Sequence, residues 1–352
     1  MTALPFQIDL DLLERLSNRS GVSGDERGVR QLVVEEIAPF VTDFEVDPLG
    51  NLLIEQSAEE GKGKLKVMVA AHMDEVGFML TARDGEGIYR FEKAGGIPDK
   101  FMAGKAVKVG KDEIPGVIGV KPVHFLEKKK KGKIVPLDQL RVDVGPEQDE
   151  QVQVGDRVVF DTTFQELEDH ILGKAFDDRL GVALLVELVK HPPRNITLMA
   201  AFTVQEEIGL RGAGVAAFSL DPDCSVVLDT TPARDFPVWD STQENIHYNT
   251  RLGAGAAIYT ADAGTLSDPR LVDHFIRTAE GQDILYQRRQ PGGGRTDAAA
   301  IHGQRAGIPS ISISVPTRYL HSPVCVVNIH DYQSTLSLLQ AGLETLPDVL
   351  NE

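Results

Sequence analysis

Apolar runs and helical periods alternate along most of the chain. Near-continuous apolar stretches at residues 64–71, 196–203 and 225–228 predict strands buried on both faces, as in a parallel sheet. Apolar residues at helical spacing predict helices at about 179–190 and 332–346. Strands that alternate with helices are typical of an α/β domain.

The pattern changes in the middle of the sequence. From about residue 75 to residue 165, short β-like runs alternate with glycine turns, and few helical periods occur. We therefore expect a small β domain at residues 76–165, inserted into a discontinuous catalytic domain made of residues 1–75 and 166–352.

A short polar segment interrupts the helical spacing near the start of the chain. It reads SGVSGDE at residues 20–26, with Glu26 three residues after Ser23. This is the spacing of a capping box, in which the two side chains bond the first backbone amides of a helix. The sequence therefore predicts a second helix from about Asp25, capped by Ser23 and Glu26.

Composition and charge narrow the function classes. The formal net charge of -17 over 352 residues argues against nucleic acid or an anionic membrane as a partner and fits the binding of divalent cations. No run approaches the roughly 18 apolar residues of a membrane span, and no signal peptide is evident. Cys224 and Cys325 do not form a disulfide framework, so a cytoplasmic location is expected.

Potential metal ligands stand at five places where a strand ends or a helix begins. They are His72 with Asp74, Asp177 with Asp178, Glu206 with Glu207, Asp229, and His321. Taken singly, a histidine at a strand end is more often structural, and the Asp177–Asp178 pair could cap the following helix. Together they match the inventory of a two-metal hydrolase, which activates a water between two ions. Imidazole and carboxylate ligands in this mixture suit zinc, cobalt or manganese.

Chemical requirements give these residues different roles. Neighbours on an extended chain point to opposite sides, so one residue of the Glu206–Glu207 pair can bind a metal while the other faces the substrate as a base. A carboxylate that binds a metal is a poor base, but spacing alone does not show which glutamate has which role. Asp74 lies two residues after His72 and can accept a ring N–H from it, which would fix the tautomer.

Six motifs carry a resemblance to a known family. They are, in order, AHMDEVGF, GKAFDDRLG, VQEEIGLRGA, LDTTPA, GGGRTDAAAI and PTRYLHSP. The chain resembles, almost end to end, the TET-type dinuclear-metal aminopeptidases, a glutamyl aminopeptidase family whose members are often labelled cellulase M or endo-1,4-glucanase. The resemblance implies a phosphorylase/hydrolase-like zinc-exopeptidase α/β domain, with a mixed sheet flanked by helices and an inserted small β-barrel-like domain.

The resemblance also implies an activity and an assembly. Members of the family remove N-terminal residues from peptides, form dimers through the inserted domain, and commonly assemble into a hollow tetrahedral dodecamer. It implies two divalent ions per subunit, with zinc expected and cobalt or manganese as alternatives.

The resemblance assigns a role to each candidate site residue. His72 and His321 resemble the terminal ligands, Asp177 the bridging carboxylate, Glu207 and Asp229 the remaining ligands, Glu206 the general base, and Asp74 the partner of His72. It further implies a cis peptide bond between Asp177 and Asp178.

Three departures and three alternatives accompany this interpretation. Pro232, Pro237 and Arg295 differ from the usual motifs and would reshape the substrate pocket, so the preferred N-terminal residue stays open. A metal-dependent deacylase would share the catalytic core. An endo-glucanase is disfavoured because adjacent glutamates cannot flank a glycosidic bond, and a non-catalytic scaffold is disfavoured because every ligand is present.

Overall fold

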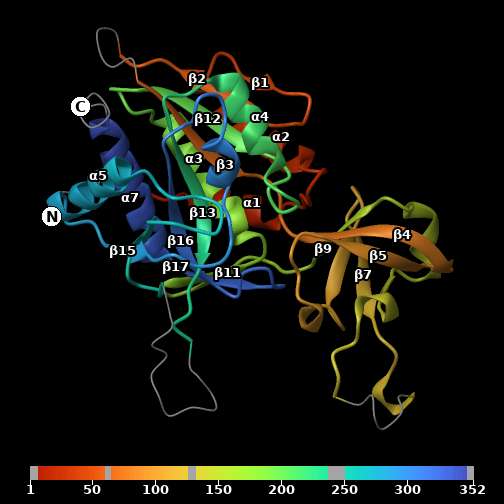
Figure 1. Cartoon of the computed structure of the whole chain (residues 1–352). Helices are drawn as coiled ribbons and strands as arrows, with labels where there is room; N and C mark the ends of the chain where they lie inside the picture. The colour runs from red at the N-terminus through yellow and green to blue at the C-terminus, as the bar shows by residue number, and fades with distance from the viewer. Residues whose placement is uncertain (1–6, 60–64, 126–131, 237–249, 347–352) are drawn as a thin grey trace, which may run out of the picture.

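One large mixed sheet, helices on both of its faces, and a separate closed barrel make up the fold (Figure 1). The computed structural model describes residues 7–59, 65–125, 132–236 and 250–346. This architecture confirms the predicted fold class, an α/β domain with a barrel-like insertion.

The large sheet places the ends of its central strands side by side. Its order is β1-β2-β12-β3-β13-β16-β17-β11-β10, and β14 joins β15 to β16. The four central strands β12, β3, β13 and β16 run parallel, so their carboxyl ends share one edge. The strands are β1 Glu45–Val46, β2 Leu52–Gln56, β3 Lys66–His72, β10 Gln165–Leu167, β11 His170–Gly173, β12 Thr197–Thr203, β13 Cys224–Pro232, β14 Ala256–Tyr259, β15 Tyr286–Arg289, β16 Ser310–Arg318 and β17 Cys325–Asn328.

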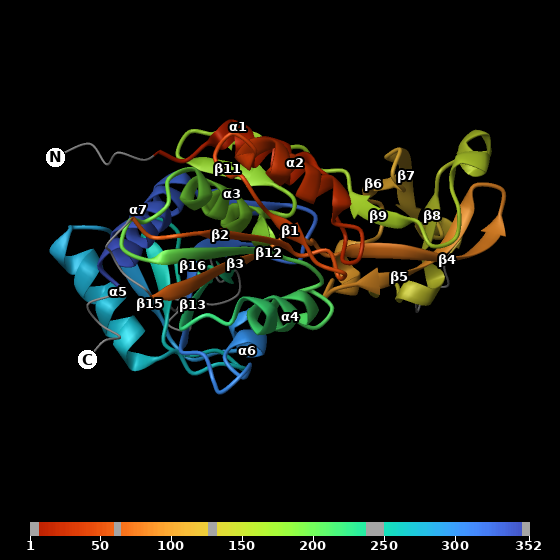
Figure 2. The same cartoon turned by 90° about the horizontal axis from the view of Figure 1, so that it is seen from above.

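Helices cover both faces of this sheet (Figure 2). Helices α1, α2, α3 and α7 contribute to the main apolar core on one face, while α4 and α6 close a smaller core on the other. The helices are α1 Leu10–Asn18, α2 Arg27–Ile37, α3 Phe176–Lys190, α4 Arg211–Leu220, α5 Pro269–Gly281, α6 Ala298–Ile301 and α7 Ile329–Thr345. Because the sheet is covered on both sides, its central strands are buried along almost their whole length. Strands β3 and β12 are nearly all apolar, as the sequence pattern predicts, whereas β13 and β16 also bury polar residues such as Ser225 and Ser312.

The barrel lies beside the sheet and has its own core (Figure 1). Its order is β4-β5-β8-β7-β6-β9, with β4 Gly77–Gly85, β5 Ile88–Ala94, β6 Ala106–Val109, β7 Ile114–Gly119, β8 Arg141–Asp143 and β9 Arg157–Phe160. Phe78 packs edge-on against Phe91 and Phe160 inside it. Short 3₁₀ turns occur at Asp99–Phe101, Val123–Phe125, Leu137–Gln139 and Pro146–Gln151.

The predicted capping box at the start of the second helix is wrong. Helix α2 begins at Arg27, and its N-cap residue Glu26 makes no side-chain cap hydrogen bond. The Ser23 hydroxyl instead donates to Asp74 Oδ2 at 2.6 Å, and Glu26 Oε1 accepts the amide of Gly24 at 2.7 Å. The buried carboxylate of Asp74 takes the Ser23 hydroxyl away from the helix amides. The spacing of residues within one short segment cannot predict a contact with a residue so far along the chain.

Two expectations from composition can be checked directly. Among the described residues, no helix is long and apolar enough to cross a membrane. Both cysteines, Cys224 and Cys325, are buried free thiols.

Candidate metal centre

The five predicted metal ligands converge at the carboxyl edge of the central strands. They form two overlapping groups, His72 with Asp177 and Asp229, and Asp177 with Glu207 and His321. In each group the potential ligand atoms lie within 4.8 Å of one another. Asp177 belongs to both groups, which is the placement that a bridging carboxylate requires.

Each ligand reaches this point from a different element. His72 is the last residue of β3, and Asp229 lies within β13. Asp177 is in the first turn of α3, where its backbone (φ -84°, ψ 102°) is not helical. Glu207 follows β12 in a turn, and His321 follows β16 in a loop. The peptide bond between Asp177 and Asp178 is cis, as the resemblance implies.

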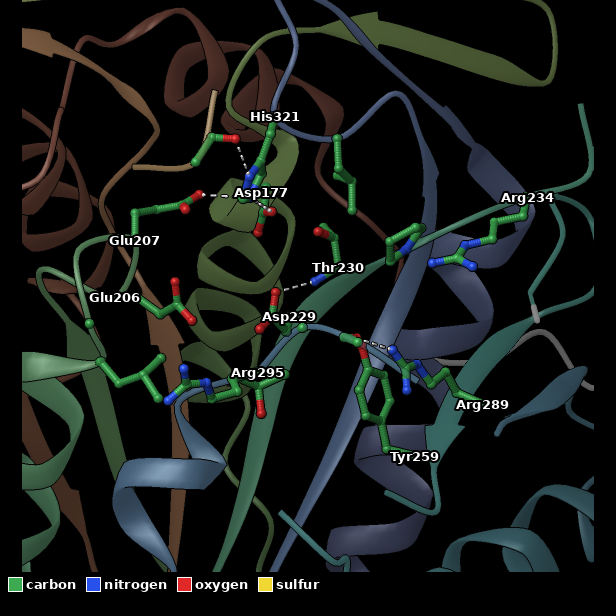
Figure 3. Close-up of a pocket in the computed structure, with 18 of the residues that line it drawn as sticks. Asp177, Glu206, Glu207, Asp229, Thr230, Arg234, Tyr259, Arg289, Arg295 and His321 are labelled. Carbon is green, nitrogen blue, oxygen red and sulfur yellow. Dashed lines mark hydrogen bonds and ion pairs between the residues drawn. The ribbon is translucent and has the colours of Figure 1, made fainter. Parts of the chain in front are cut away.

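The two oxygens of Asp177 face different histidines. Oδ1 lies 3.3 Å from Nε2 of His72, and Oδ2 lies 3.4 Å from Nε2 of His321. The same Nε2 of His321 is 3.4 Å from Oε1 of Glu207 (Figure 3). One carboxylate therefore stands between two imidazoles that approach it from opposite oxygens.

Contacts at the other ring nitrogen orient both histidines. Nδ1 of His72 lies 3.1 Å from the carbonyl oxygen of Asp74 and 3.4 Å from its carboxylate. Nδ1 of His321 lies 3.0 Å from the carbonyl oxygen of Gly96, which follows β5 in the connection to β6. A carbonyl only accepts, so in each ring Nδ1 carries the proton and Nε2 is left free to bind a cation.

The carboxylate of Asp74 holds the glutamate pair as well as His72. It is fully buried, and it accepts the backbone amides of Glu206 at 3.0 Å and Glu207 at 3.2 Å. Two charge-assisted hydrogen bonds to consecutive amides fix that stretch of backbone. Asp74 thus supports both sides of the site at once.

The expectation that Glu206 and Glu207 point to opposite sides is wrong. Strand β12 ends at Thr203, residues 207–209 form a turn, and both glutamates line the same cavity. Gln205 lies in the left-handed region with φ 59°, which costs about 1–2 kcal/mol for a residue other than glycine. The chain has left the extended conformation before the pair begins, so strand alternation does not apply.

Without a cation, protons would balance this cluster. Burial opposes the charged form of His321, but the carboxylates of Asp177 and Glu207 raise its pKa to about 11. Burial likewise opposes a charge on His72, yet Asp177 and Asp74 raise its pKa well above the usual range. The two histidines in turn outweigh burial at Asp177 and lower the pKa of that carboxyl.

Burial shifts the remaining carboxyl groups toward their neutral form. Burial raises the pKa of Glu206 well above its usual range, and the charges of Asp297 and Glu207 add to this effect. Burial and the charge of Asp177 likewise raise the pKa of Glu207 and Asp229. So many acids in one buried cluster are costly unless cations neutralise them.

The donor atoms fit a pair of divalent cations. Oε1 of Glu207 is buried, and apart from its 3.4 Å ion-pair contact with Nε2 of His321 it has no hydrogen-bond partner among the described residues. A buried carboxylate oxygen with so little compensation is costly, and a metal ion would satisfy it. Each group offers one imidazole and two carboxylates, a donor set that zinc, cobalt and manganese all accept.

A cavity of about 650 Å³ opens beside the ligands. Asp177, Glu206, Glu207, Asp229 and His321 line it, and Figure 3 shows their side chains directed toward its centre. Its wall also includes Pro232, Thr230, Tyr259, Arg234, Arg289 and Arg295. Two of the three departures from the usual motifs, Pro232 and Arg295, therefore border the cavity, while Pro237 lies outside the described residues.

Sequence reasoning missed two charged residues at this site. Asp297 is buried, accepts the hydroxyl of Thr203 at 2.6 Å, and raises the pKa of Glu206 through its charge. Arg289 is buried with its guanidinium 4.6 Å from the ring centre of Tyr259 and donates to the carbonyls of Ala261 and Gly293. Asp297 opens a helix after a glycine loop, a context that also suits an ordinary cap, so local pattern could not identify it.

Comparisons with known proteins agree with this geometry. Residues 50–338 match the M42 glutamyl aminopeptidase family. The lysyl aminopeptidase of Pyrococcus furiosus is 31% identical over 96% of this chain and 98% of the relative. The structure of aminopeptidase APDkam598 from Desulfurococcus kamchatkensis superposes with a TM-score of 0.89 at 33% identity, covering 97% of this chain and 96% of that one. The Pyrococcus horikoshii TET1 peptidase, which can assemble into a tetrahedron or a large octahedral shell, gives a TM-score of 0.82 at 31% identity over 94% and 98% of the two chains.

Proposed function

The chain belongs to the M42 glutamyl aminopeptidase family, and from this premise we propose how its residues hydrolyse the first peptide bond of a peptide. The observation that carries the proposal is the pair of ligand groups that share Asp177 beside the cavity. A glutamate that belongs to neither group, Glu206, lines the same cavity.

We assign the ligands by these groups. His72 and Asp229 would hold one ion, Glu207 and His321 the other, and Asp177 both. When bound, the two ions supply Lewis acidity that polarises the scissile carbonyl and lowers the pKa of water. Zinc is the proposed metal, with cobalt or manganese as alternatives, because the carboxylate-rich donor set accepts all three.

Glu206 is the proposed general base. Its side chain lines the cavity and belongs to neither ligand group, and burial raises the pKa of its carboxyl, so this group can exchange a proton with water rather than bind a cation. Glu206 would take a proton from the attacking water and deliver it to the leaving amine. Asp74 contributes by holding the ring of His72 and the amides of Glu206 and Glu207.

Assembly into a homo-oligomer is the second part of the proposal. The TET1 relative assembles from many copies, and the barrel carries exposed apolar side chains that suit a contact between copies, including Phe125 and Ile134, each 64% exposed. We propose that residues 76–165 act as an inserted domain that forms a dimer, and that dimers build a tetrahedral dodecamer. The two buried free thiols fit a reducing compartment, so we propose a cytoplasmic location.

The substitution Glu206→Gln tests the catalytic assignment. The variant keeps the shape of the side chain and removes its basicity, so turnover should fall by about 10²–10⁴-fold while fold and metal content stay unchanged. Activity would be measured with aminoacyl p-nitroanilides and with N-acyl amino acids, which separates an aminopeptidase from a deacylase. Metal content would be measured by elemental analysis.

A matched control is Glu187→Gln. Glu187 forms an ion pair with Lys190 at 3.0 Å on helix α3, away from the cavity. Its variant should retain full turnover. Turnover in Glu206→Gln close to that of this control would remove Glu206 from the mechanism.

A further inference from the structure

The loop between α1 and α2 reaches the back of the metal centre. Within residues 20–26, Val22 forms an isolated parallel bridge with Glu75, and the amide of Glu75 donates to the carbonyl of Gly21 at 2.9 Å. Ser23 is 3% exposed and Glu26 is 4% exposed, although both are polar. Neither residue lines the 650 Å³ cavity. Their burial therefore needs a reason other than contact with a substrate.

Ser23 is a partner of the Asp74 carboxylate. Its hydroxyl donates to Oδ2 of Asp74 at 2.6 Å, and the same oxygen accepts the amide of Glu207 at 3.2 Å. The other oxygen accepts the amide of Glu206 and lies 3.4 Å from Nδ1 of His72. Three hydrogen bonds from three directions fix the orientation of this carboxylate, and Ser23 supplies the one that comes from outside the catalytic strands.

Glu26 holds the residue that precedes the catalytic pair. Its Oε1 accepts the amide of Gln205 at 3.2 Å as well as that of Gly24 at 2.7 Å. Gln205 is the left-handed residue (φ 59°) at which the chain turns out of β12. Three consecutive amides, those of residues 205–207, thus donate to buried side-chain carboxyl groups, first to Glu26 and then to Asp74.

This arrangement turns both glutamates toward the same cavity. In a continued strand the two side chains would alternate, and one would point away from the cavity. Both instead line it, which requires the backbone to be held in the turned conformation. The hydrogen bonds to Glu26 and Asp74 hold it from the amide side, while the amides of Gly209, Leu210 and Arg211 donate to the carbonyls of Glu206 and Gln205 within the turn.

We propose that Ser23 and Glu26 are positioning residues, which act through Asp74 and the Gln205 amide to fix the backbone of Glu206 and Glu207 and the ring of His72. The inference rests on the proposed function of those three residues. A role in capping α2 does not account for the two side chains, because the N-cap residue makes no side-chain hydrogen bond to the helix. Burial raises the pKa of Glu26, so a neutral amide in its place should be tolerated.

Four variants of the full chain test the proposal. Ser23→Ala removes the hydroxyl, and Glu26→Ala removes the acceptor of the Gln205 amide. Glu26→Gln retains a carbonyl oxygen at that point and should rescue the function. Ser225→Ala is the matched control, since its hydroxyl is buried and donates to Oγ of Ser310 at 2.7 Å near the start of β13, roughly 13 Å along the strand from Asp229.

The decisive readouts are the Co²⁺ affinity of the metal-free chain, measured by isothermal titration, and kcat at saturating Co²⁺. In Ser23→Ala and in Glu26→Ala, the Co²⁺ affinity and kcat should each fall by about tenfold. This is the usual effect of removing a residue that orients a metal ligand. Glu26→Gln and Ser225→Ala should match the wild type in both. Thermal unfolding compares the stability of all four variants. Ser225→Ala should lower the melting temperature because it too loses a buried hydrogen bond, and Ser23→Ala should lower it further because its lost bond is to a carboxylate.

The outcomes separate positioning from stability. A folded Ser23→Ala or Glu26→Ala variant with wild-type Co²⁺ affinity and kcat overturns the role of that residue. If Ser23→Ala does not fold, the comparison of Glu26→Ala with Glu26→Gln tests the proposal. Equal losses of Co²⁺ affinity and kcat in these two variants would overturn the role of Glu26 as acceptor of the Gln205 amide. If the wild-type chain with metal hydrolyses no aminoacyl substrate, the proposed function fails, while the Co²⁺ affinities still test the positioning.

Discussion

Asp177 is the residue on which both ligand groups depend. Its two oxygens lie 3.3 Å and 3.4 Å from the Nε2 atoms of His72 and His321. In the absence of a cation these contacts are ion pairs, and they hold protons on the imidazoles. A cation that enters the site must displace those protons, so metal binding and proton release are linked.

This linkage predicts that metal affinity rises with pH. The pKa of His321 is raised to about 11, so between pH 6 and pH 9 this ring is protonated in the metal-free chain, and the pKa of His72 is raised in the same direction. Each ring must lose its proton to bind a cation through Nε2. The association constant for Zn²⁺ should therefore increase by about tenfold per pH unit for each histidine that binds. Competition with a chromophoric chelator at several pH values measures this slope.

The variant His321→Ala provides the internal comparison. It removes one ligand and one displaced proton, so the slope of log affinity against pH should decrease by about one. Calorimetry in buffers of different ionisation enthalpy would count the released protons independently. An affinity that stays constant from pH 6 to pH 9 would contradict the ion pairs described for both rings.

At the level of elements, a buried charged cluster fastens β3, α3 and the end of α1 together behind the site. The Lys174 ammonium lies 2.7 Å from Oε1 of Glu75, and Arg179 lies 3.4 Å from the same oxygen. Arg179 also donates to the carbonyls of Met73 and Leu16. The guanidinium thus joins the residue between His72 and Asp74 to the first turn of the helix that carries Asp177.

The substitution Arg179→Met should therefore be strongly destabilising. It leaves Glu75 with one cation fewer and several buried carbonyls without a donor, and loss of one partner from a buried charged cluster costs about 3–5 kcal/mol. Chemical unfolding followed by circular dichroism measures the change. Arg83→Met is the control, because Arg83 is 53% exposed in its ion pair with Asp149, and an exposed pair contributes less than about 1 kcal/mol. Equal stability of the two variants would refute the clamping role of Arg179.

The local sequence pattern predicts where these strands lie, but it does not predict which side chains contact one another between elements. The apolar runs ending at His72 and Thr203 located β3 and β12, and the family resemblance then named the ligands. The spacing of Ser23 and Glu26 suggested a helix cap, yet their partners are Asp74 and Gln205. The partners in these two hydrogen bonds are separated by 51 and by 179 positions in the sequence. Contacts over such separations leave no periodic signal, so only the folded chain reveals them.

Across the whole molecule, the inserted segment takes part in the site. The carbonyl of Gly96 orients His321 across 225 residues of sequence, and Gly96 and Pro98 line the cavity. A β-carbon at Gly96 would lie 3.1 Å from Nδ1 of His321, so the approach is close. The segment between β5 and β6 therefore contributes to the candidate metal centre, while the barrel exposes apolar side chains.

Assembly through the barrel predicts a specific change in mass. Light scattering of the wild-type chain should give twelve times the 38.4 kDa mass of one subunit. Phe125→Glu places a charge on a large exposed apolar side chain of the barrel and should reduce that mass, because charged residues are disfavoured at the core of an interface. Phe44→Glu changes a side chain next to β1, away from the barrel, and should remain at least dimeric. A monomeric wild-type chain would refute the proposed assembly.

The order of the ligands along the chain has a consequence for synthesis. The ribosome makes His72, Asp177 and Asp229, one complete ligand group, before it makes His321. The second group is incomplete until the loop after β16 emerges and finds the carbonyl of Gly96, which was made much earlier. A growing chain therefore cannot complete both ligand groups until the loop after β16 has been made.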